Sequence, residues 1–256
     1  MRWGIIYIAF GKGHFAEMEQ SLATVRRHMP DVDVTVYTDS KRPAKGATST
    51  VQISTSTYDR AVHIDCLEDS PYETTLCLDT DTWICETVAP VVGLMERFDV
   101  AAVHTPHVSR SEVELTGIPP EFRTFNAGVF FLKRNGRTDE FLSMWKRIYR
   151  VHQQDPAPWM YKGPGRVVRV QPSLREAVYR SDVRPLTLSV EYNFRIPGAA
   201  YVEGTVKVLH GRAEWLKNVA EKINARDDRR FCMTDGTRIR MVPRHLLAGL
   251  RQQFGF

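Results

Sequence analysis

The stretch TLCLDTDTWI, from Thr75 to Ile84, contains the pattern on which the fold assignment of this 256-residue chain depends. Apolar and β-branched residues predict a short buried strand, and two carboxylates, Asp79 and Asp81, follow at its end. An acidic pair that ends a hydrophobic strand is costly unless a positive charge lies on it. Residues i and i+2 of an extended segment point to the same side, so this pair is predicted to converge on one divalent cation. Carboxylate oxygens favour Mg²⁺ or Mn²⁺, ions that commonly bridge to a diphosphate.

The segments before this stretch predict an α/β fold. GIIYIAF (4–10) is a continuous apolar strand that ends in a glycine turn, and VDVTVYTD (32–39) is the next strand. The helix between them, which Pro30 ends, has apolar residues at helical spacing, namely Met18, Leu22, Val25 and Met29. A strand, a helix and a strand within about forty residues form a βαβ unit, which requires a parallel sheet.

The remaining segments extend the same pattern. Strands are predicted over 99–104 and 127–132, and helices from Pro90 and from about Thr138 to Val151. The stretches Ser109–Phe125 and Gln153–Arg166 are expected to be long loops that act as lids or binding segments. A hairpin at Asp235–Gly236 and a short amphipathic helix from Pro243 follow. We expect one α/β domain over residues 1–256, with a core of about 1–217 and residues 226–256 as an appendage.

Composition predicts an ordinary soluble globular protein. No apolar run approaches the ~18 residues needed to span a bilayer, and the first residues do not resemble a signal peptide. Four cysteines form no C-x-x-C pair, and Cys77 is expected to be a small buried hydrophobe, so a cytoplasmic location is predicted. The net charge is +5. Its basic excess between Arg226 and Arg251 indicates either a solvated surface or docking on the anionic inner face of a membrane.

The turn after the first strand offers an alternative function. Gly11, Gly13 and Ala16 fit the pattern G-x-G-x-x-[GA], and Asp39 ends the second strand where a dinucleotide-binding fold places its ribose carboxylate. A nicotinamide- or flavin-binding protein is therefore a rival interpretation. It leaves the pair of aspartates unexplained.

Taken together, five stretches resemble the GT-A fold nucleotide-diphospho-sugar transferases, and most closely the family 8 group that includes glycogenin and bacterial lipooligosaccharide galactosyltransferases. They are the first strand with VYTD (36–39), YDRAVHIDCL (58–67), TLCLDTDTWI (75–84), FNAGVFFLKR (125–134) and VKVLHGR (206–212). They occur in the order typical of that family and span about Arg2 to Lys217. The resemblance implies a single Rossmann-like α/β domain with a mixed, mostly parallel sheet flanked by helices.

The resemblance also implies roles for individual residues. Asp79, Asp81 and His210 would bind Mn²⁺ or Mg²⁺, and Asn126 and Gln171 would act on the sugar at the catalytic centre. The expected substrate-binding residues are Tyr37, Asp39, Arg60, Asp79, Asn126, Gly128, Gln171, Gly211 and Lys217. Either Lys217 or Arg212 would supply the cation that binds phosphate.

The chain departs from the family pattern at two places. Val170 replaces the aspartate that the family often carries before Gln171, which removes a contact to a sugar hydroxyl and leaves the sugar undefined. In HGRAEWLK (210–217) the glycine and lysine are out of phase with the family's histidine motif. Family members retain anomeric configuration; an inverting enzyme would need a carboxylate base, for which Glu191 and Asp182 are candidates.

These observations predict a metal-dependent glycosyltransferase of the hexosyltransferase type. Its donor would be a nucleoside-diphosphate sugar, preferentially a UDP-sugar, and its acceptor a saccharide, a lipid-linked glycan or a protein, with no nucleic-acid partner. A sugar-nucleotide nucleotidyltransferase is an alternative, although FGKGHF (10–15) poorly matches the loop that it requires. A glycan- or nucleotide-binding module without turnover is the non-enzymatic alternative.

Overall fold

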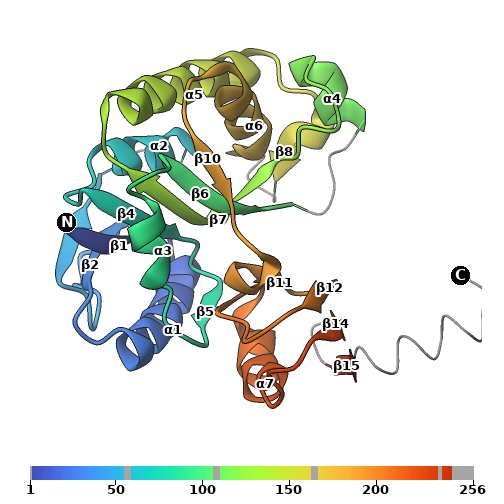
Figure 1. The fold of residues 1–256 in the computed structure, drawn as a ribbon. Helices are drawn as coiled ribbons and strands as arrows, with labels where there is room; N and C mark the ends of the chain where they lie inside the picture. Colours follow the sequence, from blue (N-terminus) through green and yellow to red (C-terminus); the bar gives the residue numbers. More distant parts are fainter. Residues whose placement is uncertain (1, 55–58, 106–109, 163–166, 236–237, 244–256) are drawn as a thin grey trace, which may run out of the picture.

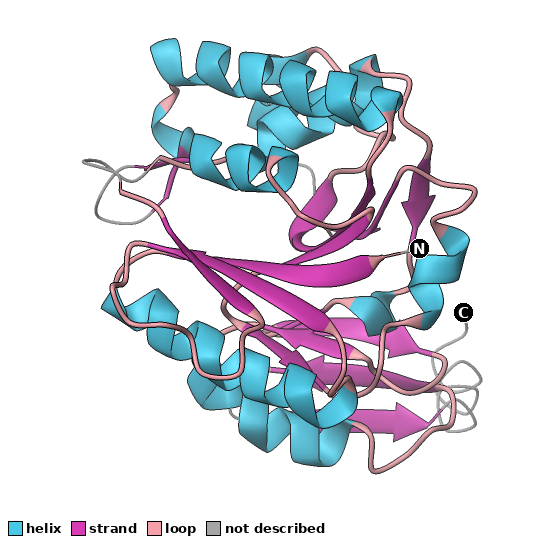
Figure 2. Ribbon diagram, turned by 90° about the vertical axis from the view of Figure 1, so that its left-hand side faces the viewer, coloured by secondary structure: helices cyan, strands magenta, loops and turns pink. Residues whose placement is uncertain are grey.

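The main body of the protein is a twisted sheet covered by helices on both faces (Figures 1 and 2). The structure is a computed structural model and describes residues 2–54, 59–105, 110–162, 167–235 and 238–243. Strands from the C-terminal third and one helix form a second, smaller group that lies beside the main sheet (Figure 1, orange to red).

The main sheet has seven strands and is mixed but mostly parallel, as the sequence predicted. In spatial order they are β10 (Pro185–Thr187), β6 (Val100–His104), β7 (Phe125–Lys133), β4 (Thr74–Leu78), β1 (Trp3–Ala9), β2 (Asp33–Thr38) and β3 (Ser49–Gln52). Strand β1 pairs in parallel with β2 and β4, which confirms the predicted βαβ unit. Strand β7 runs antiparallel to both of its neighbours, β4 and β6.

The side chains of β1 alternate between two hydrophobic cores, as a strand covered on both faces requires. Ile5 and Tyr7 pack on one face, and Ile6 and Ile8 pack on the other. The first core is closed by α1 (Lys12–His28) and α3 (Pro90–Leu94). The second core is closed by α2 (Ala61–Glu68), α5 (Gly136–Gln154) and α6 (Gln171–Arg180).

Helix α1 buries the face that its sequence predicted. Met18, Leu22 and Val25 are fully buried, and Met29 lies just beyond the end of the helix in the same core. Gly11 precedes the helix with a φ of 83°, a conformation that side chains other than glycine's rarely adopt. The first glycine of FGKGHF is therefore explained by the turn itself.

A second group of strands packs around α7 (Ala213–Ile223) and has its own apolar core. Two sheets of three strands form it, one of β11 (Phe194–Arg195), β13 (Val208–His210) and β5 (Thr82–Ile84), the other of β12 (Gly198–Val202), β14 (Arg230–Thr234) and β15 (Ile239–Pro243). Strands β14 and β15 form the predicted C-terminal hairpin. Strand β5 links this group to the main sheet, because it follows β4 directly along the chain.

Two segments expected to be long loops contain regular structure. Helix α4 (Arg110–Thr116) lies within 109–125, where Thr116 Oγ1 donates a hydrogen bond to the carbonyl of Glu112. The short helix η1 (Pro158–Met160) and strand β8 (Tyr161–Lys162), paired with β9 (Val167–Val168), lie within or next to 153–166. A last short helix, η2 (Val190–Tyr192), precedes β11. The helix predicted from Pro243 lies outside the described residues.

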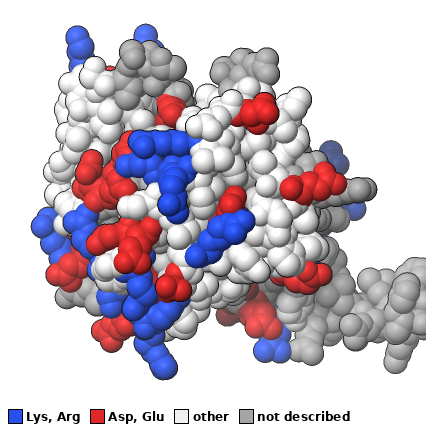
Figure 3. All heavy atoms as spheres, turned by 90° about the horizontal axis from the view of Figure 1, so that it is seen from above, with Lys and Arg blue, Asp and Glu red and all other residues white. Residues whose placement is uncertain are grey.

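On the face drawn in Figure 3, basic and acidic side chains are interspersed. Arg230, from the basic C-terminal stretch, is fully buried and donates hydrogen bonds to three carbonyls, those of Gly204, Ile223 and Asp228. The sequence pattern predicted that this arginine lies at the surface. In the structure it instead donates a hydrogen bond to the carbonyl of Ile223 at the C-terminal end of α7. No helix in the described ranges is long and apolar enough to cross a membrane.

Asp99 connects the start of β6, the start of α5 and the segment before β10. Its buried carboxylate accepts hydrogen bonds from the side chains of Asn135, Arg137 and Arg184. Asn135 also caps α5 by accepting from the backbone N–H of Arg137 and Thr138. Burial alone would raise the pKa of Asp99, but the two arginines outweigh it and hold that pKa well below its usual range.

We predict that Asp99→Asn lowers the free energy of unfolding by about 2 kcal/mol at neutral pH, because hydrogen bonds to charged groups contribute roughly 1.5–3 kcal/mol. A lowered folded pKa stabilises the protein above the ordinary aspartate pKa of about 3.9, and this contribution is lost as the pH falls through the folded value. Urea unfolding at neutral and acid pH should therefore show the difference shrinking on acidification. A difference that stays constant or grows would contradict this assignment.

Candidate functional site

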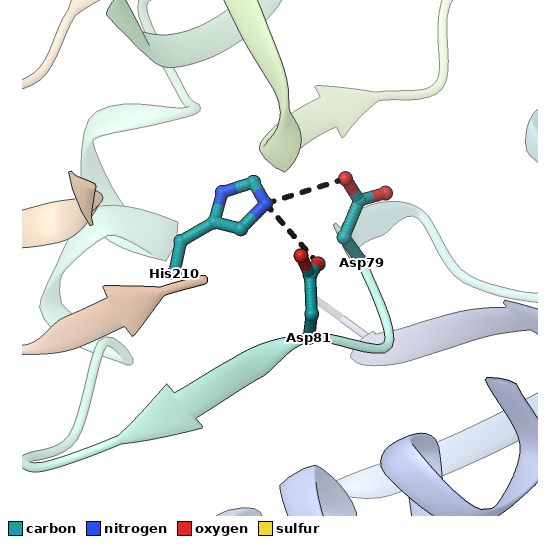
Figure 4. A group of neighbouring side chains, drawn as sticks. All are labelled: Asp79, Asp81 and His210. Atoms are coloured by element: carbon teal, nitrogen blue, oxygen red, sulfur yellow. Dashed lines mark ion pairs between the residues drawn. The ribbon is translucent and has the colours of Figure 1, made fainter. Parts of the chain in front are cut away.

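Three candidate metal ligands from two distant segments of the chain converge (Figure 4). Asp79 and Asp81 lie on the link between β4 and β5, and His210 is the last residue of β13. One ligand atom of each lies within 4.8 Å of the others. The Nε2 atom of His210 is 3.5 Å from Asp79 Oδ2 and 3.2 Å from Asp81 Oδ1. The structure thus brings together the three residues that the sequence analysis assigned to a metal.

Backbone pairing fixes this arrangement. Strands β5 and β13 are antiparallel, with Thr82 opposite His210, so the histidine is held beside the acidic link. The backbone N–H of Asp79 donates to the carbonyl of Gly128 on β7, and that of Gly211 donates to the carbonyl of Asp81, both at 2.9 Å. The two carboxylates are therefore positioned by the main chain of three strands.

Gly128 leaves the space that these ligands occupy. A Cβ atom built at this position would lie 2.1 Å from Cε1 of His210 and 2.7 Å from Oδ2 of Asp79, closer than real Cβ contacts. The chain is thus shaped to admit the imidazole and the carboxylate next to β7. Two carboxylates and one imidazole form a donor set that suits Mn²⁺ better than Mg²⁺, since imidazole is a poor ligand for Mg²⁺. The residues present fit a divalent cation.

In the metal-free cluster, neighbouring positive groups compensate the negative charge of the two carboxylates, which a bound cation would otherwise neutralise. Burial alone would lower the pKa of His210, but hydrogen bonds to Asp79 and Asp81 outweigh burial and raise this pKa. Burial would likewise raise the pKa of Asp79, but His210 holds it well below the usual range. Arg195 Nη1 also lies 2.6 Å from His210 Nε2. Positive charge already gathers where two carboxylates meet, as expected at a cation site.

A cavity of about 650 Å³ opens beside the cluster, at the carboxyl ends of β1 and β4. Open α/β sheets bind ligands at this edge, and the volume is that of an ordinary small-molecule site. Four arginines line the cavity, namely Arg60, Arg169, Arg195 and Arg212. Guanidinium groups bind phosphate through paired hydrogen bonds, so the cavity is suited to an anionic ligand.

Most of the predicted site residues line this cavity. They are Arg60, Asp79, Asp81, Asn126, Gly128, Gln171 and His210, together with Arg212, one of the two candidate phosphate-binding cations. Lys217, the other candidate, is exposed on α7 and does not line the cavity. Gly211 contacts the backbone of Ile196, where a Cβ atom would lie 2.4 Å from the carbonyl oxygen, so its place in the structure is accounted for by packing.

Tyr37 and Asp39, which are expected to bind substrate, do not line the cavity either. The hydroxyl of Tyr37 donates to the carbonyl of Asp69, and its ring is buried in the core. The carboxylate of Asp39 accepts a hydrogen bond from the backbone N–H of Gly11 at 2.9 Å. Their assignment to the donor stays a prediction.

The same turn bears on the dinucleotide alternative. Gly13 lies inside α1, and a Cβ atom there would meet nothing within 4 Å, so no close approach requires this glycine. Neither Gly11 nor Gly13 lines the cavity. The acidic cluster, rather than the glycine turn, is the feature that the cavity surrounds.

Several cavity residues were not predicted. His14 and Glu17 lie on the first turns of α1, and His63 lies one turn after Arg60 on α2. A sequence signal for the first two existed, because a helix that follows the central strand begins at the edge of the sheet where ligands bind. Arg195 had no such signal, since only the parallel pairing of β11 with β13 places it opposite His210.

Comparison with known proteins identifies the fold. No protein-family model and no curated protein sequence matches the chain. Among solved structures, an active-site mutant of LgtC superposes with a TM-score of 0.54 at 14% identity, over 86% of this chain and 94% of that chain. The glycosyltransferase GlyE of Streptococcus pneumoniae TIGR4 superposes with a TM-score of 0.58 at 13% identity, over 88% of this chain and 60% of GlyE.

A further match is the galactosyltransferase LgtC in complex with donor and acceptor sugar analogs, at 14% identity over 75% of this chain and 76% of that chain. Its TM-score of 0.47 is too low to support an argument. The two better superpositions show that this chain has the α/β GT-A fold of LgtC and GlyE, which confirms the fold expected from the sequence. At these identities the likeness establishes the fold alone.

We predict that Gly128→Ala weakens Mn²⁺ binding by at least about tenfold, as changes that displace metal ligands typically do, because the new methyl group collides with His210 and Asp79. Gly93→Ala is the matched control, since a Cβ atom at Gly93 meets nothing within 4 Å. Calorimetric titration of both variants with MnCl₂, with thermal unfolding to verify the fold, tests this. Equal Mn²⁺ affinity in the two variants would contradict the assigned role of Gly128.

Proposed function

We propose that this chain is a metal-dependent glycosyltransferase of the hexosyltransferase type. It moves a sugar from a nucleoside-diphosphate sugar, preferentially a UDP-sugar, to a saccharide, lipid-linked or protein acceptor, with retention of anomeric configuration. The observation that carries the proposal is the convergence of Asp79, Asp81 and His210 at the mouth of a cavity lined by arginines. The fold shared with LgtC and with GlyE, which is described as a glycosyltransferase, supports it.

The charges around the cavity are suited to a diphosphate. The two aspartates would bind Mn²⁺, or less tightly Mg²⁺, and a bound ion neutralises a diphosphate and the charge that develops as it leaves. Arg212, two residues after His210 in the sequence, lines the same cavity together with Arg60 and Arg169. These side chains would hold the phosphate oxygens that the ion leaves free.

The polar groups near the proposed sugar position are amides rather than free carboxylates. Gln171 begins α6 and lines the cavity, as does Asn126 on β7. The Oδ1 atom of Asn126 already accepts hydrogen bonds within the protein, so its Nδ2 group is the part left to contact the sugar. We assign both residues to the catalytic centre.

The placement of carboxylates supports retention. An inverting enzyme needs a base that deprotonates the acceptor. Glu191 is buried and accepts from the backbone N–H of Glu203 at 2.6 Å, and neither it nor Asp182 lines the cavity. Among the described residues, the cavity's other carboxylate is Glu17, which contacts His14 and Thr80.

The acceptor is expected to approach from the side of 109–125 and 153–166, whose segments carry α4 and η1. A lipid-linked acceptor would agree with docking on an anionic cytoplasmic membrane face through the basic C-terminal stretch.

The direct test is UDP binding with and without Mn²⁺. Because the ion bridges the aspartates to the diphosphate, we predict that Mn²⁺ strengthens UDP binding by at least about tenfold, a 1.4 kcal/mol gain, and that Asp79→Asn with Asp81→Asn abolishes this gain. Asp31→Asn, at an exposed turn, is the control for loss of surface charge. Isothermal titration calorimetry measures all three. UDP affinity that is independent of Mn²⁺ in the wild-type chain would overturn the proposal.

A second prediction separates metal binding from diphosphate binding. The guanidinium of Arg195 occupies the hydrogen-bonding position at His210 Nε2, so it competes with a cation for that nitrogen. Arg195→Leu should therefore bind Mn²⁺ a few-fold more tightly, yet bind UDP in the presence of Mn²⁺ more weakly, because a phosphate-binding cation is lost. Titrations with MnCl₂ alone and with UDP at saturating Mn²⁺ measure the two effects. A change of both affinities in the same direction would count against this competition.

A further inference from the structure

Asn193 contacts His210 of the metal cluster and has no role in the proposed function. It follows η2 and precedes β11, and it is 1% exposed. Its amide contacts Asn126 on one side and His210 on the other, at 3.0 Å in each case. A buried side-chain amide between two residues of a proposed active site must be fully paired to be tolerated.

The hydrogen bonds fix the orientation of this amide. The backbone N–H of Gly128 donates to Oδ1 of Asn126 at 2.9 Å, which identifies that atom as the acceptor. The atom of Asn193 that contacts the same oxygen must be a donor, and it is therefore the Nδ2 group. The Oδ1 atom of Asn193 then necessarily faces His210.

This orientation decides where the imidazole carries its proton. An amide oxygen can only accept, so Nδ1 of His210 must donate to Oδ1 of Asn193. In the neutral ring the other nitrogen, Nε2, then has a free lone pair. Nε2 is the atom that faces Asp79 and Asp81.

The same Nε2 atom faces the carboxylates of Asp79 and Asp81, which can only accept, so a cation bound there must replace a proton that Nε2 donates to them. The proton that stays on the ring is then the one that Nδ1 donates to Asn193.

We propose that Asn193 is a positioning residue that keeps the proton of His210 on Nδ1 and so presents the lone pair of Nε2 to the divalent cation. The hydrogen bonds that orient the Asn193 amide begin at the backbone N–H of Gly128, which fixes Asn126, and Asn126 in turn fixes Asn193. The inference rests on the proposed metal site, whose ligand it orients. Partners of this kind typically contribute 10- to 100-fold to metal affinity.

Two substitutions at Asn193 separate its acceptor from its donor. Asn193→Leu removes both, and we expect 10- to 100-fold weaker Mn²⁺ binding in calorimetric titration. Asn193→Asp keeps an acceptor for Nδ1 but sets a carboxylate oxygen against the Oδ1 acceptor of Asn126, so its Mn²⁺ affinity should fall less than that of Asn193→Leu. Asn224→Leu is the matched control, because Asn224 makes two hydrogen bonds to the backbone of Val206, remote from the cluster. This control should lower the melting temperature and leave the Mn²⁺ affinity unchanged.

The tautomer itself is read without metal. Spectra of ¹⁵N-histidine-labelled protein, recorded where the ring is neutral, should show the proton of His210 on Nδ1 in the wild-type chain and in Asn193→Asp, and on Nε2 in Asn193→Leu. A His210→Gln sample identifies the signal among the eight histidines. A proton on Nε2 in the wild-type chain would overturn the inference, as would equal Mn²⁺ affinity in Asn193→Leu and the wild-type chain. If Asn193→Leu does not fold, Asn193→Asp and the wild-type spectrum decide.

Failure of the inference differs from failure of the proposed function. A wild-type chain that binds no Mn²⁺ would refute the metal site, whatever the tautomer. A wild-type chain that binds Mn²⁺, and in which Asn193→Asp binds it as weakly as Asn193→Leu, would leave the metal site intact. That result would assign Asn193 to packing and overturn its role through His210.

Discussion

The antiparallel pairing of β5 with β13 is the constraint on which the site depends. Strand β5 comes directly after the acidic link, and β13 ends in His210, so three residue pairs in register place the imidazole against the carboxylates. The two strands lie more than a hundred residues apart in sequence. The small second group of strands around α7 therefore does more than extend the fold, because it supplies the third ligand to an edge that the main sheet builds with two.

Charge compensation and the lack of a side chain at Gly128 on β7 together allow the three ligands to lie close to one another. Two half-exposed carboxylates near one another repel, and the raised pKa of His210 and the approach of Arg195 show the compensation that the metal-free chain provides. Gly128 admits the ligands because it has no side chain, and its N–H starts the hydrogen-bond chain that orients Asn126. One glycine thus serves both the shape and the polarity of the site.

The sequence predicted the main sheet and the acidic pair because both depend on local patterns. The apolar strands, the βαβ unit and the helix that begins near Pro90 follow from periodicity and from residues that start or end helices. Spacing along the chain leaves both Lys217 and Arg212 as candidates for the phosphate-binding cation, because it cannot show that α7 turns this lysine to solvent while Arg212 lines the cavity. Tyr37 and Asp39 stay predicted substrate-binding residues; in the structure the hydroxyl of Tyr37 donates to the carbonyl of Asp69, and the carboxylate of Asp39 accepts from the N–H of Gly11.

What the sequence missed depends on long-range pairing. Asn193 and Arg195 lie next to His210 only because of the register in which β11 pairs with β13. Arg230 can be buried only because carbonyls at the end of a helix accept its hydrogen bonds. The central claim is that Asp79, Asp81 and His210 together hold a divalent cation that carries the diphosphate. A crystal structure with Mn²⁺ and UDP tests it most directly. We predict an anomalous manganese peak bonded to these three side chains and to phosphate oxygens; a diphosphate held by arginines alone, with no metal at the three residues, would contradict the account.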